Sequence, residues 1–289
     1  MKEGYMPFKG FHTYYRIVGE DKPGTPLVLL HGGPGSTHNY FEVLDSIGSE
    51  RPVIMYDQIG CGLSGAFEHT EFFNMETWLE ELVSLREYLN LKEIHILGQS
   101  WGGMLLLEYI CNHQPEGIKS AILASTLPSS QLWAQEQHRM IQELPLPMQE
   151  AIRIADETGD YTSEACVEAT NEYMVRHCAP VFTAEDPECL TRPKQSGRLA
   201  YVTGWGPNEF TPLGNLKDFN VINELKNITC PVLITSGTND LSTPLINKTM
   251  YDNIKNAKWE LFAHSRHMAF AEENDAYVEI LNDWLREHD

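Results

Sequence analysis

Short apolar runs alternate with a longer segment of helical spacing along the first half of the chain. Residues 75–89 place Trp and Leu side chains at the spacing of one helix face. The apolar runs are almost free of polar side chains, which is typical of strands in a sheet that is covered on both faces. Strands that alternate with helices predict right-handed crossovers and a mostly parallel sheet, so we expect the α/β fold class. The four runs lie at 26–30, 53–56, 94–97 and 121–124.

This alternation stops in the middle of the chain. Between residues 128 and 225 we find no clear buried strand, and the apolar positions instead follow an amphipathic helical spacing. The spacing predicts helices over 132–143, 147–157 and 163–178. We therefore interpret this segment as a helical cap that is inserted into the α/β domain.

The strand-and-helix pattern returns after the insertion. Residues 231–235 and 258–262 are predicted strands, and residues 276–286 form a predicted final helix. The sequence thus predicts three segments along the chain. They are the first part of the core (1–127), the helical cap (128–225) and the second part of the core (226–289).

Charge and hydropathy exclude several classes of partner. The formal net charge of -20 argues against binding to nucleic acid, whose phosphates require a basic surface. No apolar run is long enough to cross a bilayer, and the first residues lack the apolar core of a signal peptide. We therefore expect a cytoplasmic protein with neither a nucleic-acid nor a membrane partner.

The sequence also predicts no metal and no organic cofactor. The six cysteines are scattered and include no Cys-x-x-Cys pair, which disfavours a zinc site or a disulfide framework. The glycine-rich stretch His31–Gly35 lacks the Lys-Ser/Thr of a phosphate-binding loop.

Gly98–Gly103 is the stretch with the clearest chemistry. It reads Gly-Gln-Ser-Trp-Gly-Gly, follows the run at 94–97 and opens onto an apolar segment. A strand, a sharp turn with serine at its apex and a helix make up a nucleophile elbow, in which the serine is exposed for attack. Small residues two before and two after Ser100 leave room for the strained turn. The pattern predicts that Ser100 is a catalytic nucleophile.

A serine hydroxyl needs a base, and the base needs a carboxylate that orients it. On this fold the chain order is serine, acid and then histidine. Asp240 follows the strand at 231–235, and two histidines, His264 and His267, follow the next strand. We favour His267 as the base, because the residues after it look like the start of a packed helix.

The oxyanion of the tetrahedral intermediate requires two backbone donors. One is expected to be the N–H of Trp101, directly after the nucleophile, and the other the N–H of Gly33 in the loop after the first core strand. His31 and Asp57 are interpreted as residues that hold their loops.

Four stretches together carry a resemblance to a known family: His31–Gly35, Asp57–Gly62, Gly98–Gly103 and Gly206–Phe210. In these the chain resembles the prolyl iminopeptidases, serine exopeptidases of the α/β-hydrolase fold, and most of all the type found in lactic-acid bacteria. The similarity covers essentially the whole chain, cap included. It implies an enzyme that releases an N-terminal residue, preferably proline, from a small peptide through an acyl-enzyme.

The resemblance also implies individual roles. The nucleophile, acid and base are Ser100, Asp240 and His267, in agreement with the chain order. Glu209 corresponds to the glutamate that binds the free amino group of the substrate, and a carboxylate in a closed pocket is what a desolvated ammonium group needs. For the slot that holds the pyrrolidine ring, the aromatic candidates are Trp101, Trp205, Tyr201 and Phe210.

Two positions depart from the family pattern. Leu241 stands where some relatives have a second amine-binding glutamate, and Ile59 stands where relatives often have arginine. A missing second carboxylate would weaken the recognition of the amine and relax the preference for proline. An amino-acid amidase, an esterase or a broader aminopeptidase therefore remains an alternative. From a different class, a non-catalytic protein that binds a small molecule on a hydrolase scaffold is the second alternative.

Overall fold

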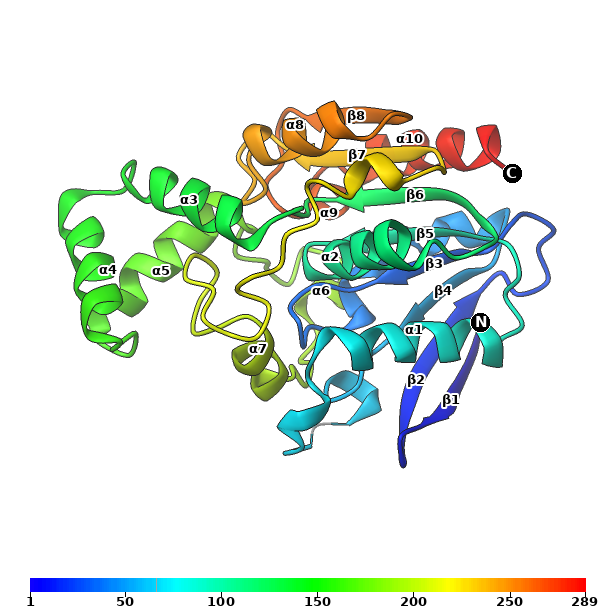
Figure 1. Cartoon of the computed structure of the whole chain (residues 1–289), viewed down its shortest axis with the longest axis horizontal. Coiled ribbons are helices and arrows are strands. Elements are labelled where there is room, and N and C mark those ends of the chain that lie inside the picture. The colour runs from blue at the N-terminus through cyan, green and yellow to red at the C-terminus, as the bar shows by residue number, and fades with distance from the viewer. Residues whose placement is uncertain (66) are drawn as a thin grey trace.

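A mostly parallel sheet forms the centre of the computed structural model, which describes residues 1–65 and 67–289 (Figure 1). In the described residues it has eight strands in the order β1-β2-β4-β3-β5-β6-β7-β8. The hairpin of β1 and β2 is antiparallel, β2 pairs antiparallel with β4, and all other pairs are parallel. The strands are β1 (Lys2–Phe8), β2 (Phe11–Val18), β3 (Leu27–Leu30), β4 (Val53–Tyr56), β5 (Ile94–Gln99), β6 (Ile118–Ala124), β7 (Val232–Gly237) and β8 (Ala257–Phe262).

Helices cover both faces of this sheet, which explains why its strands β3, β4, β5 and β7 are buried along their whole length. On β3, Val28 and Leu30 pack into one core cluster, whereas Leu27 and Leu29 pack into the other, as the two-residue period of a strand requires. The first cluster is completed by α1 (Met75–Tyr88), α2 (Trp101–Glu108) and α8 (Pro244–Asn253). The second is completed by the 3-10 helix η1 (His38–Ser49), α9 (Ala269–Glu272) and α10 (Asn274–Glu287).

The segment between β6 and β7 is helical and lies beside the carboxyl ends of the parallel strands (Figure 1). Its helices are α3 (Ser130–Ile141), α4 (Leu146–Thr158), α5 (Glu164–His177), α6 (Glu188–Thr191) and α7 (Arg198–Gly204). Trp133 and Phe210 of this segment belong to the same apolar cluster as α1 and α2. The cap boundaries at 128 and 225 stay a prediction.

Capping side chains fix the N-terminal ends of two helices. The Asn74 side chain accepts a hydrogen bond from Thr77 N at 3.0 Å and so caps α1. Ser163 caps α5 in the same way, with Cys166 N as the donor. No helix in the described part of the chain is both long and apolar enough to cross a membrane.

Candidate active site

Ser100 lies at the apex of the turn between β5 and α2. Its backbone φ is 55°, which residues other than glycine rarely adopt. Gly98 and Gly102, on either side of it, leave no room for a Cβ atom. A Cβ on Gly98 would lie 2.3 Å from Gly102 O, and a Cβ on Gly102 would lie 2.0 Å from Leu30 O. The predicted elbow geometry is therefore present, and Ser100 lines the main pocket.

The two expected oxyanion donors flank this serine. Trp101 is the first residue of α2, so its N–H has no acceptor within the helix. Gly33, in the loop after β3, has a φ of 117° and lines the same pocket as Ser100. That both N–H groups bind an oxyanion stays a prediction, which this placement supports.

Asp240 and His267 meet at the carboxyl ends of β7 and β8. The Nδ1 of His267 lies 2.7 Å from Asp240 Oδ1, and the carboxylate is only 1% exposed. Three more donors hold the same carboxylate: Ser125 Oγ at 2.6 Å, Ser242 N at 2.8 Å and Gly237 N at 3.1 Å. A carboxylate fixed in this way orients the imidazole and leaves its Nε2 free to accept a proton.

The structure distinguishes the two candidate histidines. His264 is exposed, and its backbone N–H donates to Glu273. His267 is 5% exposed and lines the pocket together with Ser100. Of the two, only His267 is hydrogen-bonded to Asp240, among the described residues.

The cap fixes the loops that carry Asp240 and His267. His267 N donates to Cys178 O at 3.1 Å, and Leu241 N donates to His177 O at 3.2 Å, both acceptors being at the end of α5. The position of His267 therefore depends on the cap as well as on the core.

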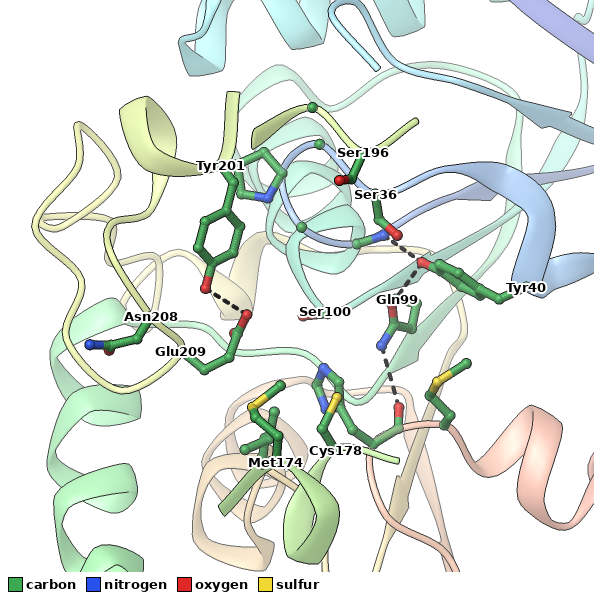
Figure 2. A pocket seen from close by; sticks show the side chains of 18 of the residues that line it. Ser36, Tyr40, Gln99, Ser100, Met174, Cys178, Ser196, Tyr201, Asn208 and Glu209 are labelled. Atoms are coloured by element: carbon green, nitrogen blue, oxygen red, sulfur yellow. Dashed lines mark hydrogen bonds between the residues drawn. The ribbon is translucent and has the colours of Figure 1, made fainter. Parts of the chain in front are cut away.

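A pocket of about 540 Å³ lies between the core and the cap (Figure 2). Ser100 and His267 line it from the core, and Glu209 and Tyr201 line it from the cap. Leu241, the position that departs from the family pattern, also lines the pocket.

Glu209 projects into this pocket, and within the described part of the chain its carboxylate has one hydrogen-bonded partner. The Tyr201 hydroxyl donates to Glu209 Oε1 at 2.6 Å, and Trp133 Nε1 donates to Glu209 O at 2.7 Å, which holds the backbone. Burial raises the pKa of Glu209, while the Tyr201 hydrogen bond and nearby His267 oppose that rise. A cationic partner would stabilise the ionised carboxylate further.

The aromatic residues that were predicted to line the pocket do not all do so. Tyr201 lines the pocket, but Trp205 and Phe210 are not among the residues that do. Trp205 is 3% exposed and packs edge-on against Trp133, and Phe210 is fully buried against Tyr173. These two side chains therefore belong to the apolar core that the cap shares with α1 and α2. Trp101 is likewise buried, with its Nε1 bonded to Gln58 at 2.8 Å.

His31 and Asp57 hold their loops, as the sequence predicted. His31 accepts from Gln58 N at 3.0 Å, and burial lowers its pKa to about 4, which keeps the ring neutral. Asp57 accepts from His38 N at 2.7 Å and from Leu63 N at 2.8 Å.

The sequence did not mark several of the residues that line the pocket, among them three with polar side chains. Gln99 and Tyr40 are hydrogen-bonded to each other beside Ser100, and Lys194 lines the pocket from a loop of the cap. Gln99 was within the elbow motif, but Tyr40 and Lys194 have no local pattern that marks them.

The cysteines show no sign of a site. All six are free thiols, and within residues 1–65 and 67–289 no cluster of His, Cys, Asp or Glu has the makings of a metal site. Cys178 lines the pocket, but burial raises the pKa of its thiol far above the usual range, which disfavours the nucleophilic thiolate.

Comparison with known proteins defines the class first. Residues 25–274 match the family model described as alpha/beta hydrolase fold. Among solved structures, that of a proline iminopeptidase from Mycobacterium smegmatis has a TM-score of 0.88 at 28% identity, over 99% of this chain and 98% of that one. The structure of VinJ has a TM-score of 0.90 at 30% identity, over 100% and 99%. The fold is thus that of an α/β hydrolase.

Curated relatives narrow the assignment. The chain is 57% identical to a proline iminopeptidase from Clostridium botulinum, over 99% of each chain. It is 52% identical to one from Lactobacillus helveticus, over 99% of this chain and 98% of that protein. The chain therefore belongs to the proline iminopeptidases within the α/β hydrolases.

Proposed function

We propose that this protein is a serine exopeptidase that releases an N-terminal residue, preferably proline, from small peptides. The observation that carries the proposal is the pocket itself, which places a carboxylate of the cap, Glu209, opposite Ser100 and the Asp240–His267 pair. Relatives named proline iminopeptidase at 51–57% identity support the same activity. That it acts in the cytoplasm stays a prediction from the sequence.

In the proposed mechanism, the ammonium group of the substrate binds Glu209, which sets the first carbonyl over Ser100. Ser100 Oγ attacks the carbonyl carbon while His267 Nε2 takes its proton, and the N–H groups of Gly33 and Trp101 bind the oxyanion. The C–N bond then breaks, and His267 protonates the leaving amine. Water then attacks the acyl carbon while His267 takes its proton, the ester bond to Ser100 breaks, and His267 returns the proton to Ser100 Oγ as the first residue leaves.

The test is a panel of anilides of proline, alanine and leucine, each with a free and with an acetylated amino group. We expect kcat/KM to be highest for the free proline anilide, and acetylation to abolish most of the activity, since a blocked amine gives Glu209 no cation. Ser100→Ala should lower kcat by several orders of magnitude, about 10⁴-fold or more, without loss of the fold. Equal rates on free and acetylated anilides would contradict an exopeptidase.

One observation favours a second candidate. Leu241 adds an apolar side chain to the pocket where a second carboxylate would stand in some relatives. A broader aminopeptidase, or an amidase or esterase for small acyl groups, would need only one carboxylate. Comparable kcat/KM values for the proline, alanine and leucine anilides would favour this candidate.

A further inference from the structure

Lys194 is a cation in the pocket for which the proposed mechanism has no use. It lines the pocket with Ser100, and it forms no ion pair with any described residue. Arg192, two residues earlier, is by contrast bound by Glu42 at 2.9 Å and by Glu188. The unpaired charge of Lys194 is therefore not explained by the packing of its own segment.

The segment that carries Lys194 is fixed to the core. Gln195 O accepts from Gly62 N at 2.8 Å, and Gly197 N donates to Gly35 O at 2.7 Å. The packing there is tight, since a Cβ on Gly197 would lie 2.6 Å from Gly60 O. These contacts hold Lys194 beside the loop that also carries Gly33.

Lys194 lies beside Tyr40, whereas Glu209 lies beside Tyr201. Its Nζ is 5.4 Å from the centre of the Tyr40 ring, and Figure 2 shows Tyr40 and Glu209 on opposite sides of Ser100. Arg198, the next cation on the segment, instead lies over Tyr201, 5.6 Å from its ring, on the side of Glu209.

This arrangement matches the charges of a dipeptide. When Glu209 holds the amino group, the first residue fills that side of the pocket, and the leaving residue must lie on the other side of Ser100. In a dipeptide the leaving residue carries a free carboxylate two bonds from the leaving nitrogen. Lys194 is an exposed residue, but partial burial of its ammonium group in the pocket lowers its pKa, so a carboxylate beside it would restore a favourable partner.

We propose that Lys194 forms a subsite for a carboxylate on the leaving residue of the substrate. The carboxylate is either the free α-carboxylate of a dipeptide or the acidic side chain of the second residue in a longer peptide. The inference rests on the proposed exopeptidase function, and it makes Lys194 a specificity-determining residue for the leaving group.

The experiment compares prolylalanine, prolylalanine amide and proline anilide, with kcat and KM measured separately. We expect KM for prolylalanine to be about tenfold lower than for its amide, the magnitude of one charge-assisted contact. Lys194→Met should remove this difference and leave the anilide and the amide almost unchanged, and Lys194→Arg should restore it. Lys255→Met, at an exposed lysine of the core, is the control for the loss of one charge. Added salt should raise KM for prolylalanine only.

Two further peptides separate the sources of the carboxylate. If prolylglutamate amide is preferred to prolylglutamine amide, and Lys194→Met abolishes that preference, the subsite also accepts an acidic side chain; without the preference, only the α-carboxylate is bound. Equal KM values for prolylalanine and its amide in the unchanged protein would overturn the subsite while leaving the exopeptidase intact. Failure to cleave any of the three first substrates would instead remove the proposed function, and the subsite with it.

Discussion

Two effects shift the pKa of the Glu209 carboxylate in opposite directions. Burial raises its pKa and favours the protonated form, which has no charge to offer an ammonium group. The Tyr201 hydroxyl, 2.6 Å away, donates to the carboxylate and favours the ionised form. The phenol of Tyr201 is itself held protonated, because burial and the nearby Glu209 raise its pKa well above the usual value. Tyr201 therefore acts through Glu209, as a positioning residue.

Tyr201→Phe should shift the acid limb of the pH profile. Because the hydrogen bond lowers the pKa of Glu209, its loss raises that pKa further, and the ionised carboxylate is lost at a higher pH as the solution is acidified. We expect the acid limb of kcat/KM for proline anilide to move up by roughly half to one pH unit. A nitrophenyl acetate ester, which has no amine, should keep its profile.

Glu209→Gln is the reference for this measurement. It removes the charge at every pH, so it should raise KM for the anilide at all pH values and spare the ester. An identical shift on both substrates in Tyr201→Phe would show that the titrating group serves the ester as well as the anilide and is not Glu209, and would remove the role of Tyr201.

At the scale of elements, one chain of hydrogen bonds joins the loops that the mechanism uses. Gly32 N, after β3, donates to the Tyr40 hydroxyl of η1 at 2.6 Å. Tyr40 donates to Gln99 Oε1 at the end of β5 at 2.9 Å, and Gln99 Nε2 donates to His267 O at 3.3 Å (Figure 2). The loop that carries Gly33, the end of β5 before Ser100 and the backbone of His267 are thus linked through the side chains of Tyr40 and Gln99.

Tyr40→Phe should loosen this linkage. It leaves Gly32 N and Gln99 Oε1 without their partner, at a cost of about 1–3 kcal/mol in the free energy of unfolding. We expect a lower Tm and a fall in kcat of roughly tenfold with little change in KM, because the reacting groups lose alignment while Glu209 still binds the amine.

Tyr56→Phe is the matched control for Tyr40→Phe. Tyr56 is fully buried, and its hydroxyl has no hydrogen-bond partner in the described part of the chain. Its removal should leave both kcat and Tm unchanged or slightly raise Tm. If Tyr40→Phe behaved like Tyr56→Phe, the hydrogen-bond chain would have no part in catalysis.

The elements were predictable where the pattern is local. β4 (Val53–Tyr56) matches its predicted run, and α5 (Glu164–His177) lies within a residue of its predicted ends, because buried strands and capped helices show their period directly in the sequence. At α2 the sequence predicts a helix that begins at the turn, as α2 does at Trp101, but not the π-helical turn at Tyr109–His113 that follows it. No spacing signals such a turn.

The site was predictable only where chemistry dictates the residue type. Ser100, Asp240 and His267 follow from the order that a triad takes on this fold, and the structure pairs Asp240 with His267. Tyr40 bonds to Gln99 across 59 positions of sequence, a contact that no local pattern encodes. The positions of Trp205 and Phe210 in the cap depend on which aromatic rings its small core takes up, and that is settled only by packing in three dimensions.

At the scale of the whole molecule, buried ionisable side chains differ in whether an opposite charge faces them. Arg51 is 1% exposed and is matched by the Asp289 carboxylate at 2.7 Å, which joins the start of β4 to the last residue of the chain. Glu81 of α1 is fully buried as well, yet it forms no ion pair with any described residue. Among the described residues its carboxyl group is hydrogen-bonded only to Thr13 of β2 and to the N–H of Ile59, so it joins α1, β2 and the loop after β4 through neutral partners.

Glu81 therefore links the stability of the fold to pH. Burial raises its pKa from 4.5 to about 8 in the folded protein, whereas in the unfolded chain the group ionises near the ordinary value. Between these two pH values the folded state binds more protons than the unfolded state, so the free energy of unfolding falls as the pH rises, by about 1.4 kcal/mol per unit at most.

Glu81→Gln should remove this dependence, because the amide can donate to Thr13 and accept from Ile59 without a charge. Thermal unfolding followed at pH 6, 7 and 8 is the measurement. We expect Tm of the unchanged protein to fall across this series relative to Glu81→Gln, with the variant the more stable of the two at pH 8. Glu87→Gln, at an exposed position of the same helix, should follow the unchanged protein. Parallel Tm curves for all three proteins would show that Glu81 is ionised in the fold, and that its burial is compensated by a group other than Thr13 and Ile59.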